Sequence, residues 1–315
     1  MGRALEPVAA ARILRARPRL EFRFGKFSWE IVRKGNESLY AVTDGKEKVT
    51  ARVAYAFGQG KSGQTYVLEY DGAFYESRVS FYNAIQGLDF TLGHPRTEPD
   101  SLAAALGKPM PRDETLQCFS CHSTGTVIGT ELHLDKMIPG VSCESCHGPG
   151  GNHMAAAKAG LPCRDRIFNP ARLNADDMAQ EFCGACHRSA MDIFARPNQD
   201  GLNNVRFQPY RVFKSKCYSD DPRIKCTVCH DPHNSVEHDA AYYDLKCLAC
   251  HSPTRGTTPV SPASASSEAS SAPSCKIESK KCATCHMPKV ELPGAHFGFT
   301  DHRIRVVRPG EPYPY

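Results

Sequence analysis

The motif CxxCH occurs six times in this chain of 315 residues, and no other feature restricts the fold as strongly. Its cysteine pairs are Cys118 and Cys121, Cys143 and Cys146, Cys183 and Cys186, Cys226 and Cys229, Cys247 and Cys250, and Cys282 and Cys285. A histidine follows each pair directly: His122, His147, His187, His230, His251 and His286. With 15 Cys and 13 His placed at random, roughly 0.03 copies of the motif would be expected, so the repetition has a chemical cause.

The motif is the attachment signal of c-type haem. Two thiols three positions apart on one helical turn reach the two vinyl groups at one porphyrin edge, and the next imidazole reaches the iron. Six motifs therefore predict six covalent haems (haem c, iron), with the motif histidines as proximal ligands. Structural zinc is the alternative, but zinc does not need a histidine after every second cysteine. A thioredoxin-like redox pair is expected once, beside a βαβ pattern.

Seven histidines lie outside the motifs, one more than six distal positions require: His94, His133, His153, His233, His238, His296 and His302. His153 lies six residues beyond proximal His147, and six residue steps span at most about 21 Å. That segment contains the turn-forming residues 148–151, so it can hardly run around a ring edge, and His153 is expected to bind a neighbouring haem. The same holds for His233, three residues beyond His230. Such segments would bring haems close enough to exchange electrons.

Further distal ligands are expected at His94, His296 and His302, whereas a solvated position suits His133 and His238 equally well. The count predicts mostly bis-histidine haems.

The predicted fold class is α+β. Residues 20–85 contain no cysteine, and the segments FRFGKFSWEIV, SLYAVTDG, VTARVAYAFG, QTYVLEYDG and AFYESRVSFY predict an antiparallel β-meander or small barrel. We expect this part to cap and shield haems, with Trp29 in its core; a docking face for a partner is the alternative. Only 41% of the chain is hydrophobic, so covalent haems are expected to form much of the remaining core.

The predicted domains are therefore 1–97, rich in strands, and 98–315, a hexahaem cytochrome domain of irregular segments and short helices, for example at 98–107 and 171–182. Residues 252–280 are rich in Ser, Ala and Pro and predict a flexible surface loop. Cys163, Cys217 and Cys275 lie outside the motifs, and two of them could pair.

The formal charge of +5 omits two propionates on each haem. Basic residues are better explained as propionate partners than as nucleic-acid contacts: Arg206, Arg211, Lys214 and Lys216. The sequence contains no apolar segment of 18 residues, so it predicts no membrane span. Because c-type haems are attached outside the cytoplasm, a periplasmic or extracellular location is expected. The first residues, MGRALEPVAAARILRARPRLEF, are not typical of a signal peptide, so we expect that the signal was removed or that this start is internal.

Several segments together resemble a group of bacterial multihaem c-type cytochromes that is related to the tetrahaem cytochromes of nitrifiers and is sometimes fused to tetratricopeptide repeats. They are GVSCESCHGPGGNH, RFQPYR, CTVCHDPH, KCLACH, CHMPK and FTDHRIRV, and the likeness extends over nearly the whole chain. The resemblance implies His153 as a distal ligand, with His94, His233, His296 and His302. Such proteins often begin with a further CxxCH and a segment similar to Met1-Gly2-Arg3, which implies a truncated N-terminus and a seventh haem in a longer native chain.

The expected function is extracytoplasmic electron transfer between redox partner proteins. In one variant the chain forms a homo-oligomer or filament, and a histidine of one copy ligates a haem of the next. The alternative is an enzyme, a multihaem oxidoreductase of a small nitrogen or sulfur compound at one five-coordinate haem, with Arg206, Tyr210, Arg211 and His238 as candidate members of the site. A sensor or scaffold module rests on the resemblance alone. Six filled distal positions favour electron transfer, and five favour the enzyme.

Overall fold

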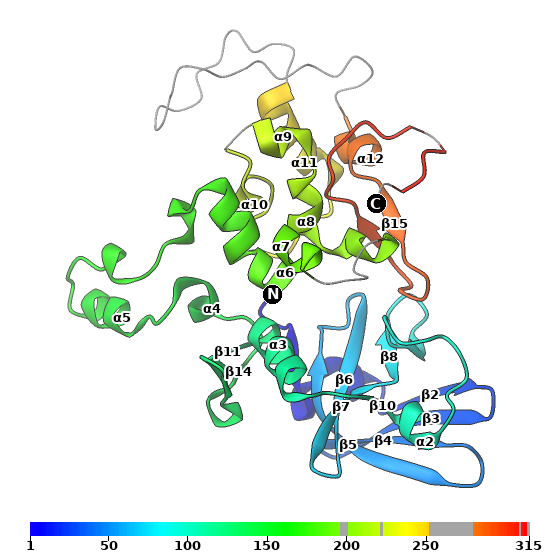
Figure 1. The fold of residues 1–315 in the computed structure, drawn as a ribbon. Helices are drawn as coiled ribbons and strands as arrows, with labels where there is room; N and C mark the ends of the chain where they lie inside the picture. The colour runs from blue at the N-terminus through cyan, green and yellow to red at the C-terminus, as the bar shows by residue number, and fades with distance from the viewer. Residues whose placement is uncertain (196–200, 221–222, 252–279, 309, 314–315) are drawn as a thin grey trace. The chain divides into compact units, whose positions relative to one another are not determined.

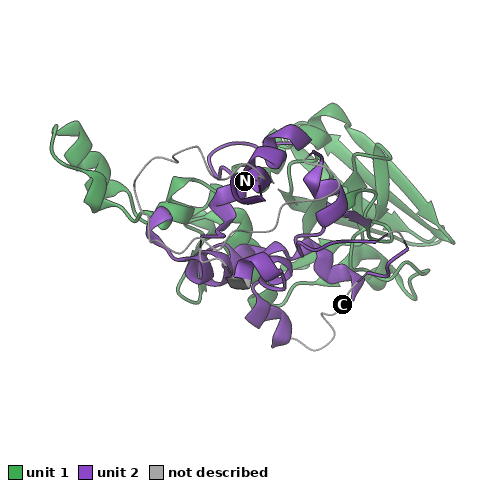
Figure 2. Ribbon diagram, turned by 90° about the horizontal axis from the view of Figure 1, so that it is seen from above, with its two compact units in different colours: residues 1–170, 291–298 green, residues 171–290, 299–315 purple. Residues whose placement is uncertain are grey.

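The computed structural model describes residues 1–195, 201–220, 223–251, 280–308 and 310–313 (Figure 1). The chain divides into two compact units, residues 1–170 with 291–298 (unit 1) and residues 171–290 with 299–315 (unit 2), which Figure 2 colours separately. Within the described ranges no helix has the length and apolar character needed to cross a membrane. The predicted loop 252–280 lies outside the described residues except for Lys280.

Unit 1 is built around one antiparallel sheet. Its strands are β1 (Leu5–Pro7), β2 (Arg19–Phe24), β3 (Phe27–Lys34), β4 (Glu37–Thr43), β5 (Lys48–Phe57), β6 (Gly63–Tyr70), β7 (Ala73–Ser77), β8 (Val79–Tyr82), β9 (Gly87–Phe90) and β10 (Gly107–Pro109). The strand order is β10-β7-β6-β5-β4-β3-β2, a meander in which each strand from β2 to β6 pairs with the next. Off this path, β1 pairs with β5, and β8 pairs with β6 and β9. The five sequence segments predicted as strands coincide with β2 to β8.

A tight turn between β6 and β7 illustrates why the register is well defined. Tyr70 pairs with Ala73, so only Asp71 and Gly72 form the turn. Both have positive φ, 50° and 72°, as a two-residue hairpin turn with the twist of the strands requires. Asp-Gly tolerates this conformation well, and the dipeptide therefore fixes which residues of the two strands face each other.

Alternating side chains of the sheet form the core of unit 1. In β3, Phe27, Trp29 and Ile31 are buried, and the residues between them are more exposed. The Trp29 indole donates a hydrogen bond of 2.7 Å to the Ala105 carbonyl in α2 (Leu102–Leu106). The ring of Phe90 packs edge-on against Trp29 at 5.9 Å. Trp29 therefore lies in the core, as its sequence context predicted.

The rest of unit 1 consists of short elements. They are η1 (Val8–Ala10), α1 (Arg12–Ala16), α3 (Arg112–His122), β11 (Ser123–Thr124), β12 (Val127–Ile128), β13 (Glu131–Leu132), η2 (Leu134–Lys136), β14 (Ile138–Pro139), α4 (Cys143–His147), α5 (Gly151–Lys158) and η3 (Arg164–Arg166). Phe119 of α3 is fully buried against Phe57 and Tyr55 of the sheet. This packing joins the first motif to the sheet, and the second motif also lies in unit 1. The predicted domain boundary near residue 97 stays a prediction.

Unit 2 contains short helical segments. They are η5, a π-helix (Asp177–Phe182), α6 (Gly184–His187), α7 (Ala190–Phe194), η6 (Leu202–Arg206), α8 (Gln208–Phe213), α9 (Lys216–Asp220), α10 (Cys226–Cys229), α11 (Ala240–His251) and α12 (Cys282–His286). Three short elements lie at the borders between the units: η4 (Pro170–Arg172) and the paired strands β15 (Lys289–Glu291) and β16 (Gly298–Thr300). The described chain is thus a mixture of an antiparallel sheet and helices.

Buried apolar side chains are scarce in unit 2. Its described residues form two small buried clusters, one of Ala175, Ala179 and Tyr218 and one of Ala190, Ile193 and Tyr210. Large apolar side chains near the motifs are exposed instead, among them Val228, Leu245, Met191 and Phe194. Unit 2 therefore has little side-chain core of its own.

Candidate haem attachment sites

Each CxxCH motif forms a helical turn. The first ends α3, the second is α4, the third spans Cys183 and α6, the fourth is α10 with His230 directly after it, the fifth ends α11, and the sixth is α12. The two thiols of a motif therefore lie on one side of a turn, with the histidine next to them. Among the described residues no three His, Cys, Asp or Glu side chains form a group that could hold a metal ion. A haem iron brings four porphyrin nitrogens and needs only one or two side chains.

The predicted attachment cysteines are accessible at all six motifs. Cys143, Cys186 and Cys285 are exposed, and the other motif cysteines are half-buried: Cys118, Cys121, Cys146, Cys183, Cys226, Cys229, Cys247, Cys250 and Cys282. A porphyrin edge must reach both sulfurs of a pair, so an accessible position suits attachment. Attachment at these thiols stays a prediction, with which their exposure agrees.

The second cysteine of a motif differs in its surroundings from one motif to the next. Sγ of Cys121 lies 3.7 Å from the hydroxyl of Ser120 in the same turn. The backbone carbonyl of Cys285 accepts a hydrogen bond of 3.2 Å from the N–H of Val307, while its side chain is exposed. Cys250 is half-buried near the end of α11, directly before His251. The chain therefore fixes the backbone of the sixth motif and leaves its second sulfur open to a haem.

Three motif histidines are held by a backbone carbonyl. Nδ1 of His122 donates to Ala4, Nδ1 of His147 to Phe168 and Nδ1 of His286 to Arg305, each at 2.9 Å. A carbonyl can only accept, so the proton lies on Nδ1 and the lone pair on Nε2. Metal-binding histidines typically use their second nitrogen in this way. These side chains therefore fit the role of proximal ligands.

At the first and fourth motifs, burial lowers the pKa of the motif histidine, and an aromatic ring packs beside it. Desolvation lowers the pKa of His122, against the opposing effect of the Ala4 carbonyl, and Phe57 packs edge-on against its ring at 5.0 Å. Desolvation also lowers the pKa of His230, whose Nδ1 lies 3.5 Å from the hydroxyl of Tyr243. Both imidazoles are therefore neutral at pH 7, which an iron ligand must be.

A tight turn supports the third motif. An added Cβ at Gly184 would lie 2.8 Å from the Ala179 carbonyl and 3.0 Å from Cβ of Ser189, so only glycine fits between them. Ser189 and Asp192 form a capping box at the start of α7. His187 is exposed at the end of α6, and His251 is the last residue of α11.

Cysteines of different motifs lie next to each other in unit 2. A hydrogen bond from the Cys183 thiol lowers the pKa of Cys226, which joins the third and fourth motifs. Burial raises the pKa of Cys229 to about 11, and the nearby Cys247 of the fifth motif adds to the rise. Burial also raises the pKa of Cys247, against a hydrogen bond with Cys282 of the sixth motif. The four motifs of unit 2 thus follow one another in space as well as in sequence.

The carboxylate of Asp244 anchors the last two of these motifs. It accepts hydrogen bonds from the backbone N–H groups of Lys281, at 2.7 Å, and Cys282, at 2.8 Å. Burial raises the pKa of Asp244, but these two bonds outweigh that effect and the net pKa is lowered. A residue of α11 therefore holds the start of α12 through a charge-assisted contact.

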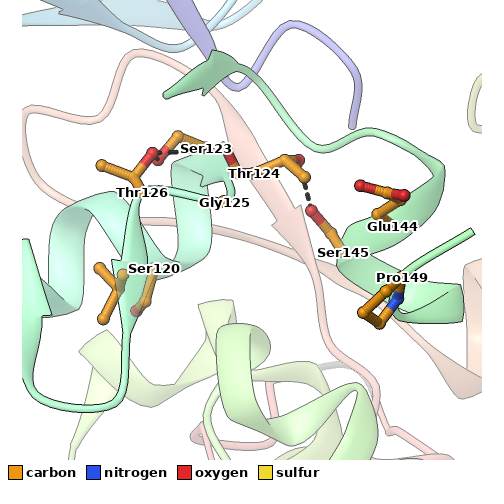
Figure 3. A pocket seen from close by; sticks show the side chains of 9 residues that line it. Ser120, Ser123, Thr124, Gly125, Thr126, Glu144, Ser145 and Pro149 are labelled. Atoms are coloured by element: carbon orange, nitrogen blue, oxygen red, sulfur yellow. Dashed lines mark hydrogen bonds between the residues drawn. The ribbon is translucent and has the colours of Figure 1, made fainter. Parts of the chain in front are cut away.

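In unit 1 the first two motifs border a cavity of about 310 Å³ (Figure 3). Its walls include Ser120 of the first motif and Glu144 and Ser145 of the second. The hydroxyl of Thr124 bonds that of Ser145 across it, and Ser123 bonds Thr126 at 2.7 Å. Residues between the motif cysteines thus face a shared polar space.

The predicted distal histidines differ in how their ring nitrogens are used. Nδ1 of His153, on α5, donates to the Cys163 carbonyl at 2.9 Å, and Nδ1 of His302 donates to Thr300 at 3.0 Å. Nε2 of His94 instead contacts Glu76 at 2.9 Å, and Nε2 of His296 contacts Asp89 at 2.7 Å. The first pair therefore presents Nε2 as a ligand nitrogen, whereas the second pair presents it to carboxylates.

The other three histidines outside the motifs are more exposed. Nδ1 of His233 lies 3.6 Å from Asp231, with most of the side chain in solvent. His133 lies 3.6 Å from Glu131 through Nε2, and His238 is exposed in the segment before α11. His133 and His233 thus lie beside carboxylates, whereas His153 and His302 donate to backbone carbonyls.

Sequence reasoning did not find several residues that hold these sites. Arg211, expected to bind a propionate, is fully buried and forms a two-pronged ion pair with Asp301, at 2.8 and 2.9 Å. Asp301 directly precedes His302 in FTDHRIRV, and an acid in that position was the available signal. Carbonyl acceptors such as Ala4 leave no signal, because every residue has a carbonyl.

Helical CxxCH turns are the attachment signal of c-type cytochromes, and carbonyl-anchored histidines are typical of metal ligands. The family model described as cytochrome c554 and c-prime matches residues 95–148, which contain the first two motifs. The match supports a c-type cytochrome with haem iron that takes part in electron transport, a class that is typically extracytoplasmic. No curated protein and no solved structure matches the chain.

Proposed function

We propose that this chain carries six covalent haems and transfers electrons between redox partner proteins outside the cytoplasm. The observation that carries the proposal is the succession of four motifs in unit 2, with Cys183 beside Cys226, Cys229 near Cys247, and Cys247 beside Cys282. Haems attached at adjacent cysteines have adjacent edges. Because electron transfer slows steeply with distance, such a series is suited to conduction along the unit.

The twelve motif cysteines would hold the porphyrins, and the six motif histidines would bind the irons. His153 and His302 are the distal ligands best supported by their ring tautomers. When bound, haem supplies an iron that gains or loses one electron at a time. The exposed apolar side chains beside the motifs, such as Val228 and Leu245, would be covered by the apolar macrocycles.

The resemblance to multihaem cytochromes of nitrifiers and to those fused with tetratricopeptide repeats is part of the same proposal. So are the export of the chain, the second domain at 98–315 as a hexahaem domain, and His94, His233 and His296 as further distal ligands. For His94 and His296, ligation through Nε2 requires that Glu76 and Asp89 give up their contacts.

The test is low-temperature electron paramagnetic resonance on oxidised protein matured in a host that attaches c-type haem, with haem quantified in the same sample. We expect six haems per chain, all low-spin. Fewer than six covalent haems in the mature protein would contradict the proposal.

One observation favours a second candidate, an oxidoreductase of a small nitrogen or sulfur compound. If Nε2 of His94 and His296 stays with its carboxylate, five histidines remain for six distal positions. One iron would then keep an open position, which a substrate or a histidine of a second copy could occupy. A stoichiometric high-spin signal in the same experiment would select this candidate, and its loss on raising the protein concentration would select the second copy.

A further inference from the structure

The segment that carries His302 is held on both sides by unit 2. Asp301 accepts two hydrogen bonds from Arg211 of α8 and one of 2.7 Å from Arg305, and neither Arg211 nor Asp301 is exposed. Ser215 donates to the His302 carbonyl at 3.2 Å and accepts from the N–H of Ile304 at 2.8 Å. A buried, two-pronged pair of this kind restricts the backbone next to it. The His302 ring is therefore presented from a fixed position.

The imidazoles of His302 and His230 are neighbours within unit 2. Their ring centroids lie 6.1 Å apart, with planes inclined by 36°. With metal–nitrogen bonds of about 2.0 Å and centroids about 1.1 Å behind the ligand nitrogens, two imidazoles on opposite sides of one metal have centroids about 6.2 Å apart. Rings that merely pack against each other also have centroids about 4.5–7 Å apart. The distance between the centroids therefore does not by itself distinguish ring packing from shared ligation of one metal.

The protonation of the two rings is a second observation that favours a shared metal. The Thr300 carbonyl, 3.0 Å from Nδ1 of His302, holds the proton on that nitrogen and leaves a lone pair on Nε2. At His230 the Tyr243 hydroxyl lies 3.5 Å from Nδ1 and donates its own proton to the Glu237 carbonyl at 3.1 Å. The oxygen of Tyr243 therefore faces Nδ1 as an acceptor. Both rings have Nε2 available for a metal, and one of them belongs to a CxxCH motif.

We propose that His302 is the distal ligand of the haem attached at Cys226 and Cys229, so that His230 and His302 bind one iron from opposite faces. The inference rests on the proposed function, because it requires covalent haem. His187 of the third motif also lies close enough to influence His302, so the haem attached at Cys183 and Cys186 is the competing destination.

The first experiment replaces His302 in the full haem-loaded chain. In His302→Ala we expect six haems by quantification and conversion of one of them to high-spin in the paramagnetic resonance spectrum. Val306→Ala is the control in the same segment, because Val306 is exposed and cannot ligate iron, and its spectrum should equal that of the parent. If all haems of His302→Ala remain low-spin while six are present, the inference is overturned and the proposed function stands.

A second variant, His302→Met, covers the case in which His302→Ala does not attach all of its haems. Methionine is itself a haem ligand, so we expect six low-spin haems of which one has a raised reduction potential, since histidine–methionine ligation raises it. Six unchanged potentials would overturn the inference. Loss of covalent haem from the unmutated chain would count against the proposed function instead.

A variant without the haem of the fourth motif identifies the haem that His302 ligates. The variant Cys226→Ala with Cys229→Ala should carry five haems. Adding His302→Ala to it should create no new high-spin signal, because the haem that His302 ligates is already gone. A new high-spin haem in this background would assign His302 to another iron, such as that of the third motif, and would overturn the inference.

Discussion

The two units of the molecule bury apolar side chains to very different extents. The principal cluster of unit 1 contains 20 buried hydrophobic residues, whereas the described part of unit 2 contains two clusters of three. Unit 2 nevertheless carries four of the six motifs. Burying a large apolar side chain contributes about 1.5–3 kcal/mol, and ordering each residue costs about 1–2 kcal/mol of backbone entropy. Side chains can therefore stabilise the sheet, but unit 2 needs a further source of buried apolar surface.

The largest expected effect is the loss of unit 2 when haem is not attached. In a full chain made without haem attachment, we expect backbone amides of the sheet to remain protected from hydrogen exchange and those of α8 and α11 to exchange freely. Mass spectrometry of exchanging protein, with the haem-loaded chain as control, measures both units in one sample. Protected amides in α8 and α11 of the haem-free chain would show that side chains alone suffice there.

The next effect concerns the sheet. Trp29→Ala should lower the free energy of unfolding of unit 1 by about 3–5 kcal/mol, because it empties a fully buried site. Trp29→Phe keeps an apolar ring but loses the hydrogen bond to Ala105, and should cost less. Urea unfolding followed by circular dichroism measures both, while the haem content should not change. Equal effects of the two variants would argue against a cavity as the cause.

The smallest effect is at the surface of the sheet, in the turn between β4 and β5. Hydrogen bonds from the backbone N–H groups of Glu47 and Lys46 lower the pKa of Asp44 below its usual 3.8. Its charge therefore stabilises the fold fully at pH values above 3.8, and this contribution is lost as the pH falls through the lower folded value.

Asp44→Asn should thus reduce the unfolding midpoint in urea slightly at neutral pH, and the difference from the parent should vanish in acid. The parent protein, measured over the same pH range, is the reference. A difference for Asp44→Asn that is constant over pH would assign the effect to shape and not to charge.

Local patterns allowed much of this structure to be predicted. The alternation in β3 and the Asp71-Gly72 turn are encoded within a few residues, as is the helical turn of each motif. Contacts between distant residues were not predictable in that way. Phe119 packs on Phe57, 62 positions away, and Arg211 pairs with Asp301, 90 positions away. These pairings depend on which surfaces meet after folding, and the choice of nitrogen at His94 and His296 depends on them too.

The carbonyl acceptors behind His122, His147 and His286 also bear on the driving force of electron transfer. A hydrogen bond from Nδ1 makes the opposite nitrogen a stronger electron donor, which favours the oxidised iron and lowers its midpoint. A carbonyl has no proton to gain or lose, so this bias stays constant as the surroundings become acidic. The reduction potentials of irons with such ligands would keep their order over a range of pH. Electrons would therefore keep one preferred direction along the series of haems.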